Sequence, residues 1–346
     1  MVKLQYLLLS LGVFLILPFT VYAESSSSNP NSVFKKAVLK EKVEPYYPYT
    51  ELKNGREGWV VVSYVVDPEG RVIDSVVEDS SGVDSFEKSA LKSLQYLVYE
   101  PATHNGVALA QSQTKLKIYF RLKNSKKSAG RRFYKEYRKA AALLKAGDLA
   151  EAKIQIEKLG DSKRWNLYED AWFGFISSEY YLKTGEADKA FKYLRRAVAY
   201  DGVYLPEPLY IEALKNLYVQ EVKSHRFADA FSTAERLQEY KSDSDSAKAV
   251  SAAAEKLHAQ LDAAEVLSFN GRVEEKVWIH ELSRPHFALV TDKGSLTDID
   301  IRCKTHRQMM SMKDSTRFSV PTSWGDCRVY ISGDAGSEFR FLEYKK

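Results

Sequence analysis

Apolar runs and alternating apolar and polar residues along the first third of the chain predict three β-strands. Residues 59–66 (WVVVSYVV) are β-branched or aromatic, and the turn sequence DPEG at 67–70 leads into a second such segment at 71–78. Because the turn between them is short, these two segments predict a β-hairpin. Residues 115–122 (KLKIYFRL) alternate between polar and apolar side chains and predict a third strand.

A helix is predicted between the hairpin and the third strand. Apolar residues recur at helical spacing over 86–98, and Asp84 and Glu87 have the spacing of a capping box at the start of this segment. Pro101 is expected to end the helix. Helix and strands together predict a small α/β domain over 33–123, with helices on one side of a sheet.

A recurring sequence in the middle of the chain predicts stacked helix pairs. The segments 145–152 (KAGDLAEA), 183–190 (KTGEADKA) and 224–230 (SHRFADA) align, and their final alanines are 38 and 40 residues apart. A small residue at that position lets two antiparallel helices approach closely, and the glycine of the first two segments suits the turn between helices. The pattern predicts an α-helical solenoid over 128–262 and resembles tetratricopeptide repeats.

Short β-type segments separated by turn sequences follow the helical region. Such a succession predicts an all-β sandwich or small barrel over 266–346, so the whole chain is predicted to be a multi-domain α+β protein. The six strands predicted in this module are 276–280, 287–291, 298–303, 317–320, 328–332 and 338–342.

Several short sequences in the predicted α/β domain occur together in a fixed order. They are PYYP at 45–48, GREGWVVV at 55–62, VDPEGRV at 66–72 and YEPA at 99–102. In this order the segment resembles the C-terminal domain of TonB-family energy transducers. The resemblance implies a periplasmic domain that binds other envelope proteins.

The resemblance also implies where a partner binds. In the family, the last strand of the sheet pairs with an extended segment of an outer-membrane receptor, which is strand addition at an exposed edge. The alternative is that this strand is internal or covered by the domain that follows it. The partner-binding residues implied on this chain are Lys115, Lys117, Ile118, Tyr119, Phe120 and Arg121.

The first 23 residues have the layout of a secretory signal peptide. Lys3 precedes an apolar core over 7–17, and small residues end at Ala23, so we expect cleavage after Ala23 and a periplasmic location in a Gram-negative envelope. Polar residues 24–32 predict a flexible tether. The alternative is an uncleaved anchor, because no charged residue occurs over 4–23.

Two features depart from a complete energy transducer. The family's membrane anchor carries a Ser and a His, whereas this segment has Ser10 and no His, and the tether reaches only about 30 Å when extended. We therefore predict a periplasmic adaptor that binds envelope proteins. The alternatives are a membrane-anchored transducer variant for outer-membrane transport, and a cell-wall or polysaccharide binder or hydrolase acting through the C-terminal module.

Composition narrows the classes of partner. The chain is 45% hydrophobic and 28% charged, as expected of a folded protein, and a net charge of +5 over 346 residues gives no general case for nucleic-acid binding. The charge is uneven, because residues 121–139 hold nine Lys or Arg and one acid. This stretch is either a solvated linker and helix face or a contact for an acidic surface such as phospholipid headgroups or an acidic polymer. Membrane contact is otherwise expected only if the N-terminal segment is uncleaved.

The two cysteines, Cys303 and Cys327, predict a disulfide, since an even pair in an exported chain is normally oxidised. The alternative is a metal site in which the CxxH sequence at 303–306 is joined by His280, His286 and Cys327. The chain contains no GxSxG, HExxH, GxxxxGK[ST] or GxGxxG sequence. We therefore expect no enzymatic activity and no cofactor.

Overall fold

Strands and helices follow one another in three blocks along the computed structural model, which describes residues 33–125, 127–162, 165–274, 277–312 and 317–345. The predicted signal peptide and tether lie outside these ranges. The mixed α+β composition is confirmed, and residues 33–346 form one compact unit. The division of this unit into three domains stays a prediction.

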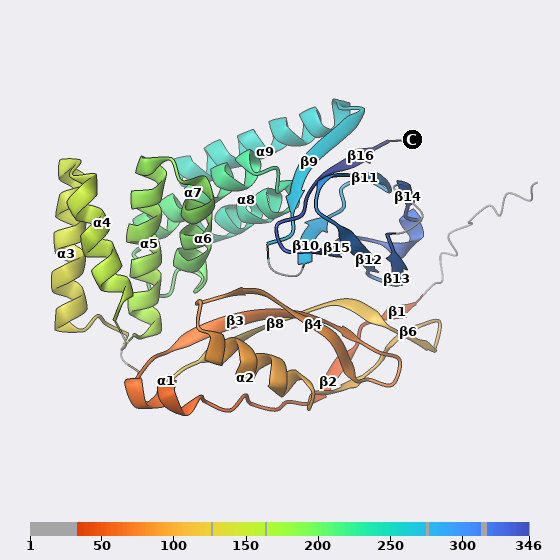
Figure 1. The fold of residues 1–346 in the computed structure, drawn as a ribbon, viewed down its shortest axis with the longest axis horizontal. Coiled ribbons are helices and arrows are strands. Elements are labelled where there is room, and N and C mark those ends of the chain that lie inside the picture. Colours follow the sequence, from red (N-terminus) through yellow and green to blue (C-terminus); the bar gives the residue numbers. More distant parts are fainter. Residues whose placement is uncertain (1–32, 126, 163–164, 275–276, 313–316, 346) are drawn as a thin grey trace, which may run out of the picture. The chain divides into compact units, whose positions relative to one another are not determined.

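The first block is a three-stranded antiparallel sheet with a helix on one face (Figure 1). Its central strand is β3 (Gly58–Val66), flanked by β4 (Val72–Ser80) and β8 (Gln111–Phe120). The helix α2 (Asp84–Leu94) packs Phe86, Ala90 and Leu94 against alternate residues of β3 and β8. A short helix, α1 (Tyr49–Asn54), precedes β3.

The hairpin of β3 and β4 forms as predicted, and its turn requires a glycine. Gly70 has a φ of +82°, and a Cβ at this position would lie 2.1 Å from the carbonyl oxygen of Tyr99. The backbone of the segment 97–100 therefore packs directly against the turn.

The predicted capping box and the predicted end of the helix are wrong. Val83 is the N-cap of α2 and makes no side-chain cap, while Glu87 accepts a hydrogen bond from Ser80 Oγ. The helix ends at Leu94, because the next residues form the strand β5 (Val98–Glu100), which pairs with β2 (Val38–Glu41). Pairing with a segment some sixty positions earlier in the sequence overrides the local helical pattern. A second small sheet joins β1 (Phe34–Lys35), β6 (Ala102–His104) and β7 (Val107–Leu109).

The second block consists of helices that pack in consecutive pairs, followed by one further helix (Figure 1). The alanines predicted to let paired helices approach, Ala152, Ala190 and Ala230, are all fully buried in the second helix of a pair. Within the described residues, none of the helices is both long and apolar enough to span a membrane. The pairs are α3 (Arg131–Ala146) with α4 (Leu149–Gly160), α5 (Leu167–Thr184) with α6 (Ala187–Val198), and α7 (Glu207–Lys223) with α8 (Phe227–Lys241); α9 (Asp245–Ala263) follows.

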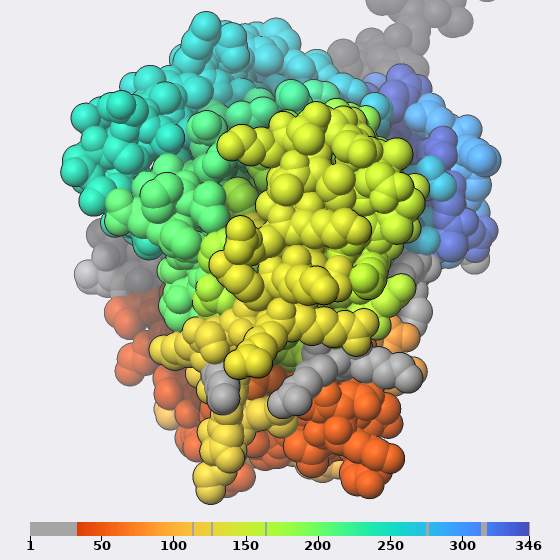
Figure 2. Space-filling model, turned by 90° about the vertical axis from the view of Figure 1, so that its left-hand side faces the viewer, coloured from red at the N-terminus to blue at the C-terminus, as the bar shows by residue number. Residues whose placement is uncertain are grey.

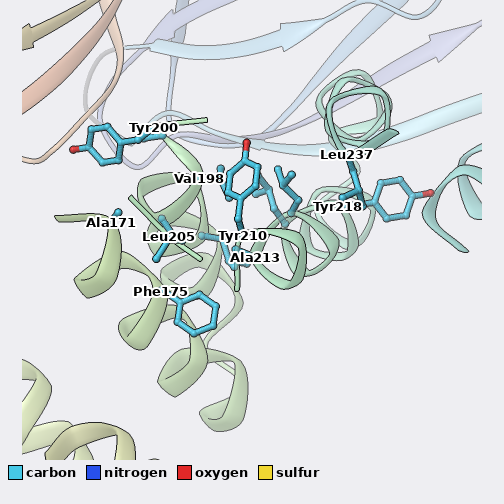
Figure 3. Packing of buried hydrophobic residues seen from close by; sticks show 14 of the residues in the cluster. Ala171, Phe175, Val198, Tyr200, Leu205, Tyr210, Ala213, Tyr218 and Leu237 are labelled. Carbon is cyan, nitrogen blue, oxygen red and sulfur yellow. The ribbon is translucent and has the colours of Figure 1, made fainter. Parts of the chain in front are cut away.

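Small residues allow both the turns within the helix pairs and the close contacts between helices. Gly147 and Gly185 adopt φ of +78° and +76° at the turns, as expected. Gly174, which the repeat pattern does not single out, lies where α5 meets α6, and a Cβ there would be 2.6 Å from the backbone nitrogen of Ala197. Figure 3 shows side chains of four consecutive helices, among them Phe175 and Tyr210, gathered in one apolar cluster.

The third block contains two four-stranded antiparallel sheets whose inward residues form one apolar cluster. All six predicted strands are present, but two further strands, β9 and β13, were not predicted. The sheet orders are β10-β15-β12-β13 and β14-β11-β16-β9. The strands are β9 (Val266–Arg272), β10 (Val277–Glu281), β11 (His286–Lys293), β12 (Leu296–Cys303), β13 (Arg307–Ser311), β14 (Arg317–Ser319), β15 (Cys327–Gly333) and β16 (Glu338–Tyr344).

The sheet of the first block is covered on both faces. Helix α2 covers one face, and the helices and the β10-containing sheet lie over the other (Figure 1). On this second face Asp79 pairs with Arg195 of α6 at 3.0 Å, and Glu78 pairs with Arg328 of β15 at 3.1 Å. Trp59 is only 1% exposed because it packs among α5 and its neighbours.

Candidate strand-addition edge

Strand β8 is the last strand of its sheet. One of its edges pairs with β3 from Gly58↔Phe120 to Val66↔Gln111, and the other edge has no backbone partner among the described residues. The strand is longer at its start than the predicted 115–122 and ends at Phe120. The strand ends there because the backbone N–H of Leu122 donates to Glu57 Oε1 at 2.7 Å and does not continue the pairing with β3.

The six predicted partner-binding residues fall into two sets in the structure. Ile118 and Phe120 are buried, and the ring of Phe120 stacks on Phe86 with 4.3 Å between centroids. They fix the strand on α2 and leave only their backbone for a partner. The remaining four residues, Lys115, Lys117, Tyr119 and Arg121, point to the opposite face, and Arg121 follows the last residue of the strand.

Side chains on this opposite face contact the chain's own body. Lys115 Nζ pairs with Glu78 at 2.7 Å, and Tyr119 Oη donates to the carbonyl oxygen of Ala199 at 3.4 Å. Arg121 donates to Tyr204 Oη at 3.4 Å. The following part of the chain therefore covers one face of β8, as the alternative expects. The outer edge of β8 has no backbone partner among the residues that the structure describes.

Lys117 has the most unusual surroundings on β8. Its ammonium donates to the carbonyl oxygen of Ala199 at the end of α6 and lies 5.0 Å from the ring centroid of Trp59 and 5.3 Å from that of Tyr119. A helix C-terminus and aromatic faces both favour a cation. Burial nevertheless lowers the pKa of Lys117 from its usual 10.5 to about 8, because the loss of hydration outweighs these contacts.

The lowered pKa of Lys117 predicts a pH dependence of stability. Between pH 8 and 10.5 the unfolded chain binds more protons at this lysine than the folded chain, so the free energy of unfolding should rise with pH across that window. We expect Lys117→Met to reduce this rise, and the exposed-site control Lys123→Met to leave it unchanged. Urea unfolding at a series of pH values measures it, and identical pH profiles for Lys117→Met and the wild type would contradict the assignment.

Two buried acids connect the sheet to the helices, and no sequence pattern indicates either. Glu57 accepts hydrogen bonds from the backbone N–H groups of Leu122 and Leu167, at 2.7 and 3.1 Å. Asp170 of α5 accepts from the indole N–H groups of Trp59 and Trp165, at 3.3 and 2.7 Å. These contacts hold β3 and β8 in place beneath the helices.

Asp170 also binds two residues that follow it in the helical block. Arg196 Nε donates to Asp170 Oδ1 at 2.7 Å, and Tyr200 Oη donates to Oδ2 at 2.8 Å. The carboxylate is fully buried and accepts from five donor groups of four residues, because Arg196 also donates through a terminal nitrogen. It is the most heavily hydrogen-bonded side chain between the sheet and α5–α6.

The C-terminal module contains the predicted Cys303–Cys327 disulfide. Its sulfur atoms are therefore not available as metal ligands. His280 Nε2 lies 2.9 Å from Glu343 Oε1, whereas His286 stacks on Tyr344. The described residues contain no group of three or more His, Cys, Asp or Glu side chains that could hold a metal ion.

The comparisons with known proteins concern the first block. Residues 43–122 match the sequence model of the family described as Gram-negative bacterial TonB protein C-terminal. Protein TonB of Vibrio cholerae serotype O1 is 31% identical over 91 residues, which make up 26% of this chain and 37% of that protein. The chain therefore spans little more than a third of the length of this relative.

Two solved structures match the same part of the chain. A solution NMR structure of the Pseudomonas aeruginosa TonB CTD is 22% identical, with 27% of this chain and 92% of that chain covered and a TM-score of 0.24. The TonB2 protein from Vibrio anguillarum is 30% identical, with 31% and 97% covered and a TM-score of 0.21. The family match and the curated relative confirm the resemblance drawn from the sequence: the chain contains a TonB C-terminal domain within residues 43–122.

Proposed function

We propose that this protein is an envelope adaptor that binds an extended segment of another envelope protein by strand addition to β8. The unpaired outer edge of β8 is the observation that supports the proposal most directly. Strand addition obtains its affinity from main-chain hydrogen bonds, which an edge strand offers without any rearrangement. The partner's class follows from the TonB-type domain, whose family acts in the Gram-negative envelope.

The covered faces of the sheet favour edge binding over face binding. With α2 on one face and the helices and C-terminal sheet on the other, the side chains of β3 and β8 are already in contact with the chain itself. Among the described residues, the outer edges of β8 and β4 are the parts of this sheet without a backbone partner, and β8 is the one that the TonB-type resemblance assigns to partner binding. An approaching strand would find β8 rigidly held, so little conformational entropy would be lost on the side of the adaptor.

The other two blocks complete the adaptor in this proposal. We assign the paired helices to a tetratricopeptide-like solenoid, because the small residues of the repeat are buried at the helix contacts. We assign the C-terminal block to a sandwich, because two four-stranded sheets share one apolar cluster. The disulfide agrees with a periplasmic location, since such bonds persist in oxidising compartments.

Crosslinking from β8 tests strand addition. The chain has only two cysteines and both are in the disulfide, so Lys115→Cys and Tyr119→Cys each introduce a single free thiol that can carry a benzophenone label. In envelope extracts we expect both labels to crosslink to one short segment of the same partner. The two attachment points should lie about four residues apart, because side chains on one face of paired strands advance in step.

Ile73→Cys is the matched control. Ile73 lies on β4, the opposite edge strand of the sheet, and is 38% exposed, the same fraction as Tyr119. Its label should not reach the segment that the β8 labels mark. Crosslinks that scatter over a folded partner's surface, or that are equally strong from Ile73→Cys, would reject strand addition at β8.

A further inference from the structure

The outer face of α3 is strongly basic. Six of its residues are exposed cations, and five of them, all in the first three turns, fall within about 120° of the helix circumference at 100° per residue. Phe133, Ala140 and Leu144 lie on the opposite side and are buried against the other helices. The five cations are Arg131, Arg132, Lys135, Arg138 and Lys139.

None of these five cations forms an ion pair within the described part of the chain. The one acid of α3, Glu136, is turned toward α4, where it accepts from Gln155 and pairs with Lys158 at 3.1 Å. No ion pair among the described residues therefore neutralises the positive charge of the outer face.

The placement of two of these cations conflicts with the stability of the helix. Arg131 and Arg132 occupy the first turn of α3, which contains no acid, and the N-cap Gly130 provides no side-chain cap. A helix N-terminus carries partial positive charge, so cations there are unfavourable and anions are favourable. The Glu169 carboxylate of α5 offsets part of this charge, because it accepts a hydrogen bond from the backbone N–H of Gly130 at 2.7 Å. It is therefore the five exposed cations as a set that point to a function of this face.

An aromatic side chain accompanies the cations. Tyr134 is 57% exposed, and the guanidinium of Arg138 lies 5.7 Å from the centroid of its ring. Tyrosine has an apolar ring and a polar end, which suits the boundary between water and lipid. Figure 2 shows the protein from this end. Helix α3 (yellow) lies at the front, and no other helix packs over it.

We propose that the outer face of α3 binds a membrane surface that carries anionic phospholipid headgroups. Each Lys or Arg of a cluster next to such a surface is attracted to the negative headgroups, and an exposed tyrosine adds a contact at the boundary between water and lipid. The face belongs to the first helix of the array and is not covered by another helix. It can therefore lie against an extended plane without any movement of the fold.

An acidic polymer fits the same surroundings less well. The cleft beside the start of α3, with a volume of about 950 Å³, is the place where a flexible chain would be enclosed. Its lining includes Glu57, Asp161 and Glu169 together with Arg131 and Arg132. Acids in this cleft would repel a polyanion, whereas a planar bilayer would contact only the outer face of α3.

Vesicle flotation of the full chain, as isolated from cells, tests the proposal. We expect the protein to bind vesicles of phosphatidylcholine mixed with phosphatidylglycerol more tightly than phosphatidylcholine alone, and to lose that difference at high salt. The double variant Lys135→Gln with Lys139→Gln should bind the anionic vesicles about 30-fold more weakly. Glutamine retains a high helix propensity, so α3 itself should persist.

The matched control is Lys35→Gln with Lys36→Gln. It removes the same charge from two exposed lysines that have no ion pair within residues 33–345 as far as the structure describes them, and it should leave the affinity for anionic vesicles nearly unchanged. Equal losses in the two double variants would show an effect of net charge only and overturn the proposal. So would binding to soluble polyglutamate, dependent on Lys135 and Lys139, without any preference for anionic vesicles.

Discussion

Replacing Asp170 with alanine is expected to lower the free energy of unfolding by about 3–5 kcal/mol. The carboxylate is fully buried and is the counter-ion of Arg196, which would be left charged and unpaired in the interior. The indole N–H groups of Trp59 and Trp165 would lose their acceptor at the same time. The wild type and the variant are compared by urea unfolding.

Two further variants test whether the loss of stability in Asp170→Ala comes from the buried charge. Asp170→Asn keeps an acceptor oxygen but removes the charge, so it should lose stability while remaining closer to the wild type than Asp170→Ala. Asp188→Ala removes an exposed carboxylate from the first turn of α6 and should cost less than about 1 kcal/mol. Similar losses in Asp170→Ala and Asp188→Ala would show that the buried carboxylate does not join the sheet to the helices.

Removing the disulfide is expected to lower the free energy of unfolding by about 3 kcal/mol, as the chain-entropy model gives for a loop of this size. Cys303 and Cys327 are 24 positions apart and connect the neighbouring strands β12 and β15. Their sulfur atoms also lie in the apolar cluster of the C-terminal module. Alanine at both positions removes the crosslink and keeps the site apolar.

Chemical reduction provides the control for this prediction. The reductant should lower the unfolding midpoint of the wild type toward that of the double alanine variant, and it should not change the variant. A wild type whose midpoint is the same with and without reductant would contradict the expected contribution of the bridge.

The sequence predicts best those parts of the fold that local patterns determine. The β3–β4 hairpin and the turns at Gly147 and Gly185 follow from residues within a few positions of each other. The end of α2 is not predictable in this way, because β5 owes its conformation to β2. Strand β9 contains the dipeptide Asn270-Gly271, which favours a turn. The glycine is needed instead because the ring of Phe339 would lie 2.2 Å from a Cβ at position 271.

The candidate site is predictable only through the resemblance. Alternation identifies 115–122 as a strand, but its position at the edge of the sheet follows from the order β4-β3-β8, which no local pattern contains. The connection between Trp59 and Asp170 spans 111 positions of sequence. Its partners are an aromatic residue in a strand and an acid in a helix, and neither residue stands out from its neighbours in the sequence.

The covered second face of the TonB-type sheet affects how this domain can be studied. A fragment that ends at residue 123 would uncover Trp59 and leave the ammonium of Lys117 without the carbonyl oxygen of Ala199. Because Glu78 and Asp79 would also be uncovered, such a fragment would present an apolar and charged surface that the intact chain does not show to its surroundings. Partners captured by the excised domain would then report on that artificial surface, so the physiological ligand has to be sought with the whole protein.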